Sequence, residues 1–197
     1  MAKSSENVQP DPVDGQRQLS MGWQVGGLLG WLVVCFGASA IGSAVTISEI
    51  EGWYAGLEKP SFNPPNWIFG PVWSVLFFLM AVAAWLVWRR FGFAGAKAAL
   101  VVFLVQLVAN VIWSVLFFGL HSPSMAFFWI CLLWVLIAAT ITLFWMKSPL
   151  AGGLLAPYLT WVSFASVLNF WIWQLNAGRL CFLAHIPRLN PFGLCTD

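Results

Sequence analysis

The stretch AALVVFLVQLVANVIWSVLFFGL, residues 98–120, contains no Asp, Glu, Lys or Arg. A helix needs about 20 mainly apolar residues to cross the hydrocarbon core of a bilayer, and this stretch is long enough. Its apolar and polar residues do not alternate as they do in a strand of a membrane β-barrel. The segment is therefore predicted to be a transmembrane helix.

Four more uncharged windows lie on either side of it, at residues 23–47, 67–88, 124–146 and 150–175. Over the chain, 60% of residues are hydrophobic, 8% are charged and the mean hydropathy is +0.83, which excludes an ordinary soluble domain. The connections are short except for the first, so a second domain has no room. We expect an all-α membrane protein with one bundle of five transmembrane helices across residues 21–176.

The basic residues between these windows predict an orientation. The side of the membrane that carries the N-terminus would hold six of them, namely Lys3, Arg17, Arg89, Arg90, Lys97 and Lys147. The opposite side would hold three, namely Lys59, Arg179 and Arg188. Because basic loops remain on the cytoplasmic side, we expect an integral, multi-pass protein whose N-terminus is cytoplasmic.

The two ends of the chain differ from the bundle. Residues 1–20 are polar and are predicted to form a disordered tail. Within the first window, Ala38-Ser39-Ala40 is similar to a signal-peptidase site, but this apolar region is longer than the ~7 to 15 residues of a signal, so we expect it to remain as a helix. Residues 177–197 form a tail of unassigned structure. Its possible metal ligands, Cys181, His185 and Cys195, are too few and too widely spaced to predict a zinc site.

The first connection, residues 48–66, is the only long internal loop, and it ends in KPSFNPPNW, residues 59–67. Proline fixes its own φ and keeps the preceding residue extended, so this segment is predicted to be stiff. Asn66 is expected to cap the second helix. Aromatic residues crowd the same end of the bundle: Trp53, Tyr54, Phe62, Trp67 and Phe69. We interpret the loop as a proline-rich lid, although prolines and interfacial tryptophans are also ordinary features of membrane proteins.

Helical spacing groups further aromatic and polar residues. One face of the helix carries Gln106, Asn110, Trp113 and Phe117, because these residues are spaced four, three and four positions apart. Amides facing lipid are costly unless they are partnered, so this face should lie inside the bundle. Similar faces consist of Phe69, Trp73 and Phe77, and of Trp161, Ala165 and Asn169. They would either enclose a pocket for a flat apolar ligand or simply pack against one another.

Several of these motifs occur together in one known family. The relevant residues are Trp53-Tyr54, Leu57, Lys59-Pro60, Asn63-Pro64-Pro65, Trp67, Phe69, Pro71, Trp73, Gln106-Leu107, Asn110, Trp113, Phe117-Phe118-Gly119, Pro157-Tyr158-Leu159, Trp161, Ala165 and Leu168-Asn169. In these residues the chain resembles the TspO or translocator protein family, also called the tryptophan-rich sensory protein family. The resemblance covers about residues 22–175.

This resemblance implies a five-helix receptor that binds porphyrins, and in animals cholesterol and drugs, under a lid formed by the first loop. It also implies a homodimer. Trp53 and Tyr54 would belong to the lid, and Ala165 matches a position where a small residue admits the ligand. The expected ligand contacts are Trp53, Tyr54, Asn63, Trp67, Phe69, Trp73, Phe77, Gln106, Asn110, Trp113, Phe117, Trp161, Ala165 and Asn169.

Two departures narrow the expected ligand. The sterol-associated pattern of animal members needs a tyrosine and then a basic residue, but residues 167–174 have Phe or Trp and then Gln174. Haem iron needs an axial ligand, and His121 and His185 lie outside the windows. We therefore expect a metal-free porphyrin to bind at least as well as its metal complex. We also expect that the protein has no obligatory cofactor.

Other functional classes find less support in the sequence. No window contains a carboxylate, histidine or lysine for acid–base or nucleophilic catalysis, so an enzyme is not expected. An exception would be light-dependent porphyrin breakdown, for which Trp73 and Trp161 match the positions implied by the family. A sterol or lipid transporter remains an alternative, although no internal repeat or intramembrane charge is present. Nothing indicates a nucleic-acid partner. The small-residue pairs Gly26 with Gly30 and Gly95 with Ala99 could pack helices within one chain or between two copies.

Overall fold

The structure is a computed structural model that describes residues 20–183, 188–189 and 195–196. The predicted N-terminal tail up to residue 19 and the side chains of Cys181, His185 and Cys195 lie outside this description.

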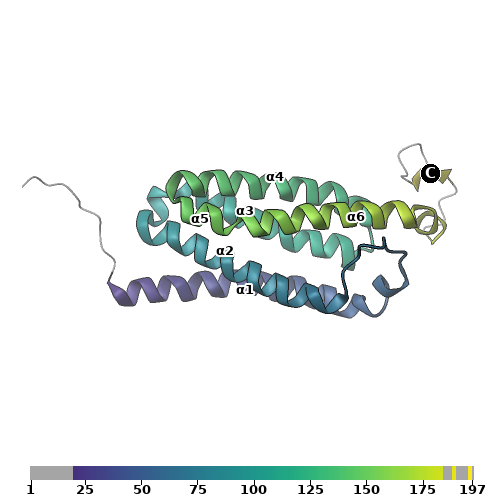
Figure 1. The fold of residues 1–197 in the computed structure, drawn as a ribbon, viewed down its shortest axis with the longest axis horizontal. Helices are drawn as coiled ribbons and strands as arrows, with labels where there is room; N and C mark the ends of the chain where they lie inside the picture. The colour runs from purple at the N-terminus through teal and green to yellow at the C-terminus, as the bar shows by residue number, and fades with distance from the viewer. Residues whose placement is uncertain (1–19, 184–187, 190–194, 197) are drawn as a thin grey trace, which may run out of the picture.

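Long helices account for most of the described chain (Figure 1). The elements in order are α1 (Met21–Ile50), the 3₁₀ turn η1 (Tyr54–Gly56), α2 (Asn66–Gly95), α3 (Lys97–Ser114), the π-helical turn η2 (Val115–Gly119), α4 (Pro123–Lys147), α5 (Pro149–Leu154), α6 (Ala156–Leu183), and the antiparallel pair β1 (Arg188–Leu189) and β2 (Cys195–Thr196). Among the described residues, five helical segments are long and apolar enough to cross a membrane. The expected five-helix bundle is confirmed.

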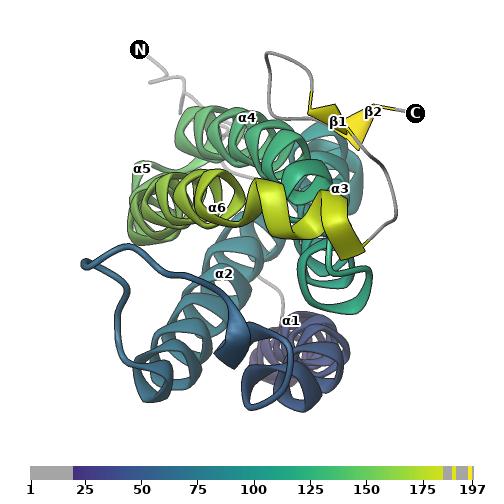
Figure 2. The ribbon, with the colours of Figure 1, turned by 90° about the vertical axis from the view of Figure 1, so that its right-hand side faces the viewer.

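The end of the bundle that carries the start of α1 is tightly packed. At the N-terminal end of α1, the indole Nε1 of Trp85 donates a 2.8 Å hydrogen bond to the carbonyl of Gln24. A Cβ on Gly27 would collide with the ring of Trp88, so only glycine permits this approach of α1 to α2. Figure 2 shows the loop after α1 crossing the other end of the bundle toward α2.

Two details of the helices differ from the sequence prediction. Asn66 is the first residue of α2 and makes no side-chain capping bond, so the predicted cap is wrong; Pro65 occupies the cap position in an extended conformation. The fifth span is broken at Leu155, whose N–H bonds to the carbonyl of Gly152 at 3.1 Å. Pro157 has no N–H to give to the preceding turn, which explains why the helix restarts there.

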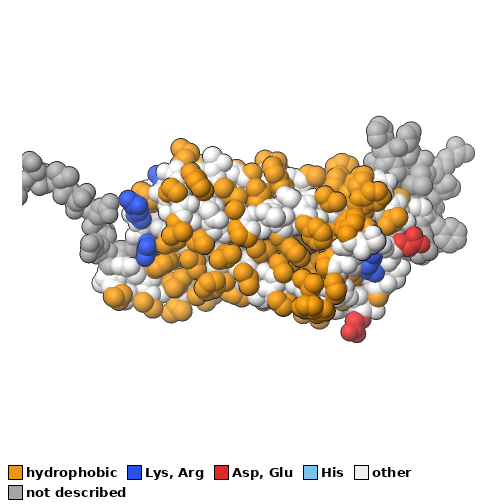
Figure 3. All heavy atoms as spheres, in the orientation of Figure 1, with side chains coloured by type: hydrophobic (Ala, Val, Ile, Leu, Met, Phe, Trp, Pro, Cys, Tyr) orange, Lys and Arg blue, Asp and Glu red, His pale blue; other side chains and the backbone are white. Residues whose placement is uncertain are grey.

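Charged side chains lie at the two ends of the bundle, and the apolar surface between them faces outward (Figure 3). Large exposed apolar residues include Trp23, Val33, Ile47 and Met146, each at least 69% exposed. Such a belt would be unfavourable in water and suits the hydrocarbon of a bilayer. The described chain is therefore built as an integral, multi-pass membrane protein.

Candidate ligand-binding site

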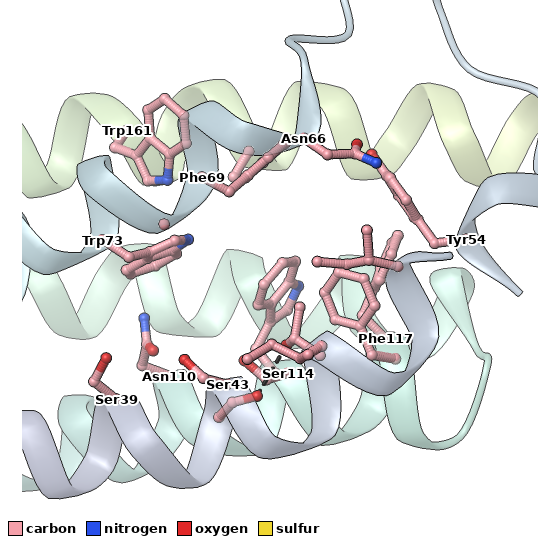
Figure 4. Close-up of a pocket in the computed structure, with 18 of the residues that line it drawn as sticks. Ser39, Ser43, Tyr54, Asn66, Phe69, Trp73, Asn110, Ser114, Phe117 and Trp161 are labelled. Carbon is pink, nitrogen blue, oxygen red and sulfur yellow. Dashed lines mark hydrogen bonds between the residues drawn. The ribbon is translucent and has the colours of Figure 1, made fainter. Parts of the chain in front are cut away.

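A cavity of about 300 Å³ lies between α1, α2, α3 and α6, at the end of the bundle that the first loop crosses (Figure 4). Its wall is formed by Ala38, Ser39, Gly42, Ser43, Thr46, Ile47, Ile50, Tyr54, Asn66, Phe69, Gly70, Trp73, Ser74, Phe77, Asn110, Trp113, Ser114, Phe117, Phe118, Trp161, Ala165, Leu168, Asn169 and Ile172. None of these is Asp, Glu, Lys, Arg or His. The cavity is thus uncharged and rich in aromatic rings.

The aromatic rings of the wall hold one another in place. Trp113 stacks on Phe117 with centroids 5.5 Å apart and an interplanar angle of 27°. Phe69 meets Trp161 edge to face at 5.9 Å. Such pairs add stability beyond the area that they bury, and they fix the faces that the rings present. The flat surfaces facing the cavity are therefore already ordered without a guest.

A chain of buried polar side chains supports one side of the cavity. The amide Nδ2 of Asn110 donates to the hydroxyl of Tyr158 at 2.9 Å, and this hydroxyl donates to Oε1 of Gln106 at 3.0 Å. All three residues are buried. The predicted inward orientation of the polar face of α3 is confirmed. Gln106 lies behind the wall, where it fixes Tyr158, and does not contact the cavity.

A second polar pair joins α3 to α6 and to the start of α4. The indole Nε1 of Trp113 donates to Oδ1 of Asn169 at 3.2 Å. The amide Nδ2 of Asn169 donates in turn to the carbonyl of Pro123 at 2.8 Å. Asn169 thereby satisfies a buried carbonyl and sets the position of an aromatic wall residue at the same time.

The loop places Tyr54 over the end of the cavity. Its side chain is buried between Phe117 and Phe118, and its hydroxyl donates to Oδ1 of Asn63 at 2.9 Å. Burial raises the pKa of Tyr54 to about 12, against a smaller opposing effect of the Asn63 bond. The hydroxyl is therefore protonated at neutral pH. Lys59 lies over the outer region of the Tyr54 ring, 4.7 Å from its centroid, and burial lowers the pKa of its amine.

Two contacts fix the loop to the bundle. The side chain of Asn176 accepts from the backbone N–H of Glu58 at 3.0 Å and donates to the carbonyl of Glu58 at 2.9 Å. On the other side, Trp53 stacks on His121 at 4.5 Å, and His121 Nε2 lies 2.9 Å from Oε2 of Glu49. The loop is thus attached to α6 and to the connection between η2 and α4.

The structure brings ten of the fourteen expected contact residues into the cavity wall. These are Tyr54, Phe69, Trp73, Phe77, Asn110, Trp113, Phe117, Trp161, Ala165 and Asn169. The other four, Trp53, Asn63, Trp67 and Gln106, do not line it. Trp67 is 74% exposed and points to the surroundings of the bundle, because it begins α2 on the outward face. Trp53 and Asn63 lie one step away, because they contact the wall residues Phe117 and Tyr54 respectively.

Sequence reasoning missed the contribution of α1. Ser39, Ser43 and Thr46 line the cavity from this helix, together with Gly42. Their spacing of four and three residues places the three hydroxyls on one helix face, which was a usable signal in an otherwise apolar window. Gly42 is buried where a Cβ would lie 3.3 Å from Oγ of Ser114, so α1 and α3 approach closely there.

The cavity reaches the outer surface between α1 and α2. Five residues of its wall are also exposed, namely Ser43, Ile47, Asn66, Gly70 and Ser74, and all five belong to these two helices. Both helices are long and apolar enough to cross a membrane, so an opening between them would face the bilayer side.

Comparisons with known proteins agree with this architecture. Residues 31–174 match the model of the TspO/MBR family. The chain is 43% identical to the tryptophan-rich protein TspO of Archaeoglobus fulgidus over 136 residues, which are 69% of this chain and 88% of that protein. It is 39% identical to the human translocator protein over 140 residues, 70% and 83% of the two chains. It is 34% identical to the tryptophan-rich sensory protein of Cereibacter sphaeroides over 161 residues, 82% and 97% of the two chains.

The matched residues include every part of α1, α2, α3 and α6 that lines the cavity, and the aligned regions extend over most of each relative. Together with the five spans and the aromatic wall, these matches show that the chain belongs to the TspO/MBR family of membrane proteins.

Proposed function

We propose that this protein is a membrane receptor that binds porphyrins in the cavity between α1, α2, α3 and α6. The observation that carries the proposal is the uncharged cavity walled by preordered aromatic rings. Flat, apolar surfaces on a ligand are best matched by such rings, which need little reordering on binding. A tetrapyrrole macrocycle has this shape and character.

The size of the cavity suggests how such a guest would sit. Pockets for small molecules occupy roughly 300 to 1,000 Å³, and this cavity lies at the lower limit. A macrocycle would therefore fill it and extend through the opening between α1 and α2. Its charged substituents would remain outside the uncharged wall, because burial of an unpaired carboxylate is costly.

Titration of the detergent-purified protein with metal-free protoporphyrin IX tests the proposal. We expect quenching of tryptophan fluorescence at a stoichiometry of one, and loss of binding in Ala165→Phe, which would fill the cavity. The matched control is Ala139→Phe on the exposed face of α4, which should bind as the unmodified protein does. Equal binding by both variants would contradict the proposal.

Haem provides a second comparison at the same site. Tyr54 is the only His, Cys, Met or Tyr in the described cavity wall, and its hydroxyl is already bonded to Asn63. We expect haem to bind no more tightly than the metal-free porphyrin. A tight complex with the spectrum of six-coordinate haem, and no binding of the metal-free porphyrin, would overturn this expectation.

Light-dependent breakdown of the bound porphyrin by dissolved dioxygen is a second candidate function. It is favoured by the positions of Trp73 and Trp161, which both line the cavity. Illumination of the complex should then bleach the porphyrin faster than free porphyrin, and the double variant Trp73→Phe, Trp161→Phe should remove the difference. Transport of a sterol or lipid is the third candidate. A measured flux of the ligand into liposomes would distinguish a transporter from a receptor.

Dimer formation also belongs to this proposal. Ala99, of the second small-residue pair considered from sequence, is buried within the chain. Gly26 and Gly30 are both exposed, and a Cβ built on either residue meets no atom within 4 Å. We infer that a second copy would pack against α1. Crosslinking through Gly30→Cys in a protein without its native cysteines would detect this contact.

A further inference from the structure

The packed end of the bundle, where α1 begins, carries four basic side chains and no acidic side chain among the described residues. The basic residues are Arg89, Arg90, Lys97 and Lys147. The described carboxylates all lie at or beyond the other end of α1, namely Glu49, Glu51 and Glu58. On the face that Figure 3 shows, Asp and Glu side chains likewise appear only at the end away from the start of α1. The packed end therefore has a positive charge that no described carboxylate neutralises.

Two of these cations meet at one aromatic ring. The guanidinium carbon of Arg90 lies 5.6 Å from the centroid of the Phe91 ring, and Nζ of Lys147 lies 5.0 Å from the same centroid. Phe91 is half-buried and packs against the core, so its position is fixed. Arg90 belongs to α2, whereas Lys147 is in the last turn of α4. The packing of the two helices thus brings two like charges to one ring, where a bound anion would relieve their repulsion.

The other two cations of this end are placed differently. The guanidinium carbon of Arg89 lies 4.3 Å from the centroid of the Trp85 ring, whose indole N–H bonds to α1. Lys97 is exposed at the first residue of α3 and makes no side-chain hydrogen bond or ring contact to a described residue. Arg89 and Lys97 therefore add charge to the same end of the bundle without belonging to the pair at Phe91.

Exposed apolar side chains adjoin the cation pair. Met146 is 76% exposed and Leu150 is 65% exposed, and they precede and follow Lys147 in the chain. Arg and Lys side chains donate charge-assisted hydrogen bonds to phosphate oxygens. A free phosphate ion would use the cations alone, whereas a phospholipid would also cover the apolar side chains with its acyl chains. The combination of cations and exposed apolar groups at the end of membrane-spanning helices favours the lipid.

We propose that Arg90 and Lys147 bind the headgroup phosphate of an anionic phospholipid beside the ring of Phe91. The acyl chains of this lipid lie against Met146 and Leu150. The packed end is the one predicted to be cytoplasmic, and the cytoplasmic leaflet is the one with a negative surface potential from anionic lipids. The site lies at the opposite end of the bundle from the cavity, so this inference does not depend on porphyrin binding.

Native mass spectrometry of the detergent-purified full chain tests the proposal, because it counts bound lipids and gives their apparent affinities. The probes are phosphatidylglycerol and phosphatidylcholine with the same acyl chains; in the second, a trimethylammonium group neutralises the phosphate. We expect one phosphatidylglycerol to bind on the order of tenfold more tightly than phosphatidylcholine. The variant Arg90→Gln, Lys147→Gln should weaken phosphatidylglycerol on the order of thirtyfold, since each basic residue contributes roughly fivefold.

Two further variants make the result specific to the pair at Phe91. The matched control, Arg89→Gln, Lys97→Gln, removes as many charges from the same end and should weaken phosphatidylglycerol less than about threefold. The charge-conserving variant Arg90→Lys, Lys147→Arg should remain within about threefold of the unmodified protein. Thermal unfolding in detergent checks that all three variants are folded.

Equal losses in the two glutamine variants would overturn the site, because the lipid would then respond only to the net charge of this end. Equal binding of phosphatidylglycerol and phosphatidylcholine would also overturn it, because the charge of the headgroup would have no effect. Inorganic phosphate distinguishes the source of the bound group: compared with chloride at equal ionic strength, it should not displace phosphatidylglycerol. Displacement by phosphate would indicate a site for a soluble anion and overturn the assignment to a lipid.

Discussion

Tyr158 shows at the residue scale how one hydroxyl organises the cavity wall. It is buried and links Asn110 on α3 to Gln106, one turn earlier. Tyr158→Phe leaves one donor and one acceptor buried without partners, which should cost roughly 1 to 3 kcal/mol of unfolding free energy. Tyr54→Phe removes the same atom from the loop and should cost less. Thermal unfolding in detergent compares the two, and equal losses would contradict this role of Tyr158.

Tyr54 also gives a pH prediction. Its pKa is raised to about 12 by burial, so the folded loop holds the phenolic proton more tightly than the unfolded chain does. The stabilising contribution is therefore complete below about pH 10, the ordinary pKa of tyrosine, and is lost as the pH rises toward 12. The chain has only two tyrosines, so ultraviolet titration of Tyr158→Phe reports Tyr54 alone. A midpoint near 10 would show that the loop does not cover Tyr54.

Whether the position of a residue could be predicted from the sequence differed from residue to residue. Asn110 and Trp113 were placed correctly because amides in an apolar helix must face partners, so periodicity alone gives their direction. Ser39 and Ser43 were missed because serine in a membrane helix commonly bonds to its own backbone and then has no preferred direction. Asn66 failed as a cap because Pro65 already sets the chain in the cap conformation. The roles of these serines and of Asn66 depend on how the helices and the loop pack in three dimensions.

At the scale of elements, Asn176 determines how the loop attaches to α6. It makes two hydrogen bonds to the backbone of Glu58 at a sequence separation of 118 residues, which no local pattern could reveal. Asn176→Ala should release the loop and raise the porphyrin dissociation rate on the order of tenfold, with little change in the helices. Stopped-flow dissociation and hydrogen exchange of residues 51–65 measure both effects.

The control for this variant is Gln174→Ala, an exposed amide on the same helix. It should leave the dissociation rate and the exchange of the loop unchanged. If Asn176→Ala dissociates porphyrin no faster than Gln174→Ala does, the loop is not the barrier to release.

The opening between α1 and α2 leads to a different prediction. Gly70 lies at its edge, and a Cβ there meets no atom within 4 Å, so a side chain such as that of Gly70→Phe can begin there without moving the backbone. The added ring should narrow the opening and slow association of porphyrin from lipid vesicles at least severalfold. Gly37→Phe on the exposed face of α1 is the matched control, because it has equal space but does not line the cavity. Equal association rates in the two variants would exclude this path.

At the scale of the whole molecule, the structure separates the charges that the sequence places between spans. Arg89 and Arg90 lie near the end of α2, Lys97 begins α3 and Lys147 ends α4, so these four lie at the packed end. The acidic residues of the described chain, Glu49, Glu51 and Glu58, lie with Lys59 at the other end, near the loop. Figure 3 shows the charged side chains gathered at the two ends. The basic end also carries the start of α1, so the positive-inside rule predicts that the packed end is the cytoplasmic one. The cavity and its loop would then open near the opposite face of the membrane.

This orientation can be tested by labelling single cysteines in intact cells with a membrane-impermeant maleimide, after replacement of the four native cysteines. Ser61→Cys in the loop should react, and Ala94→Cys between α2 and α3 should react only after lysis; both positions are exposed. Neutralising Arg89, Arg90 and Lys97 to Gln would leave three basic residues on each side, because six and three are predicted for the native chain. The bias should then weaken, and a mixed population should label at both positions. If Ala94→Cys reacts in intact cells while Ser61→Cys does not, the molecule is inverted, and its cavity and loop lie toward the cytoplasm.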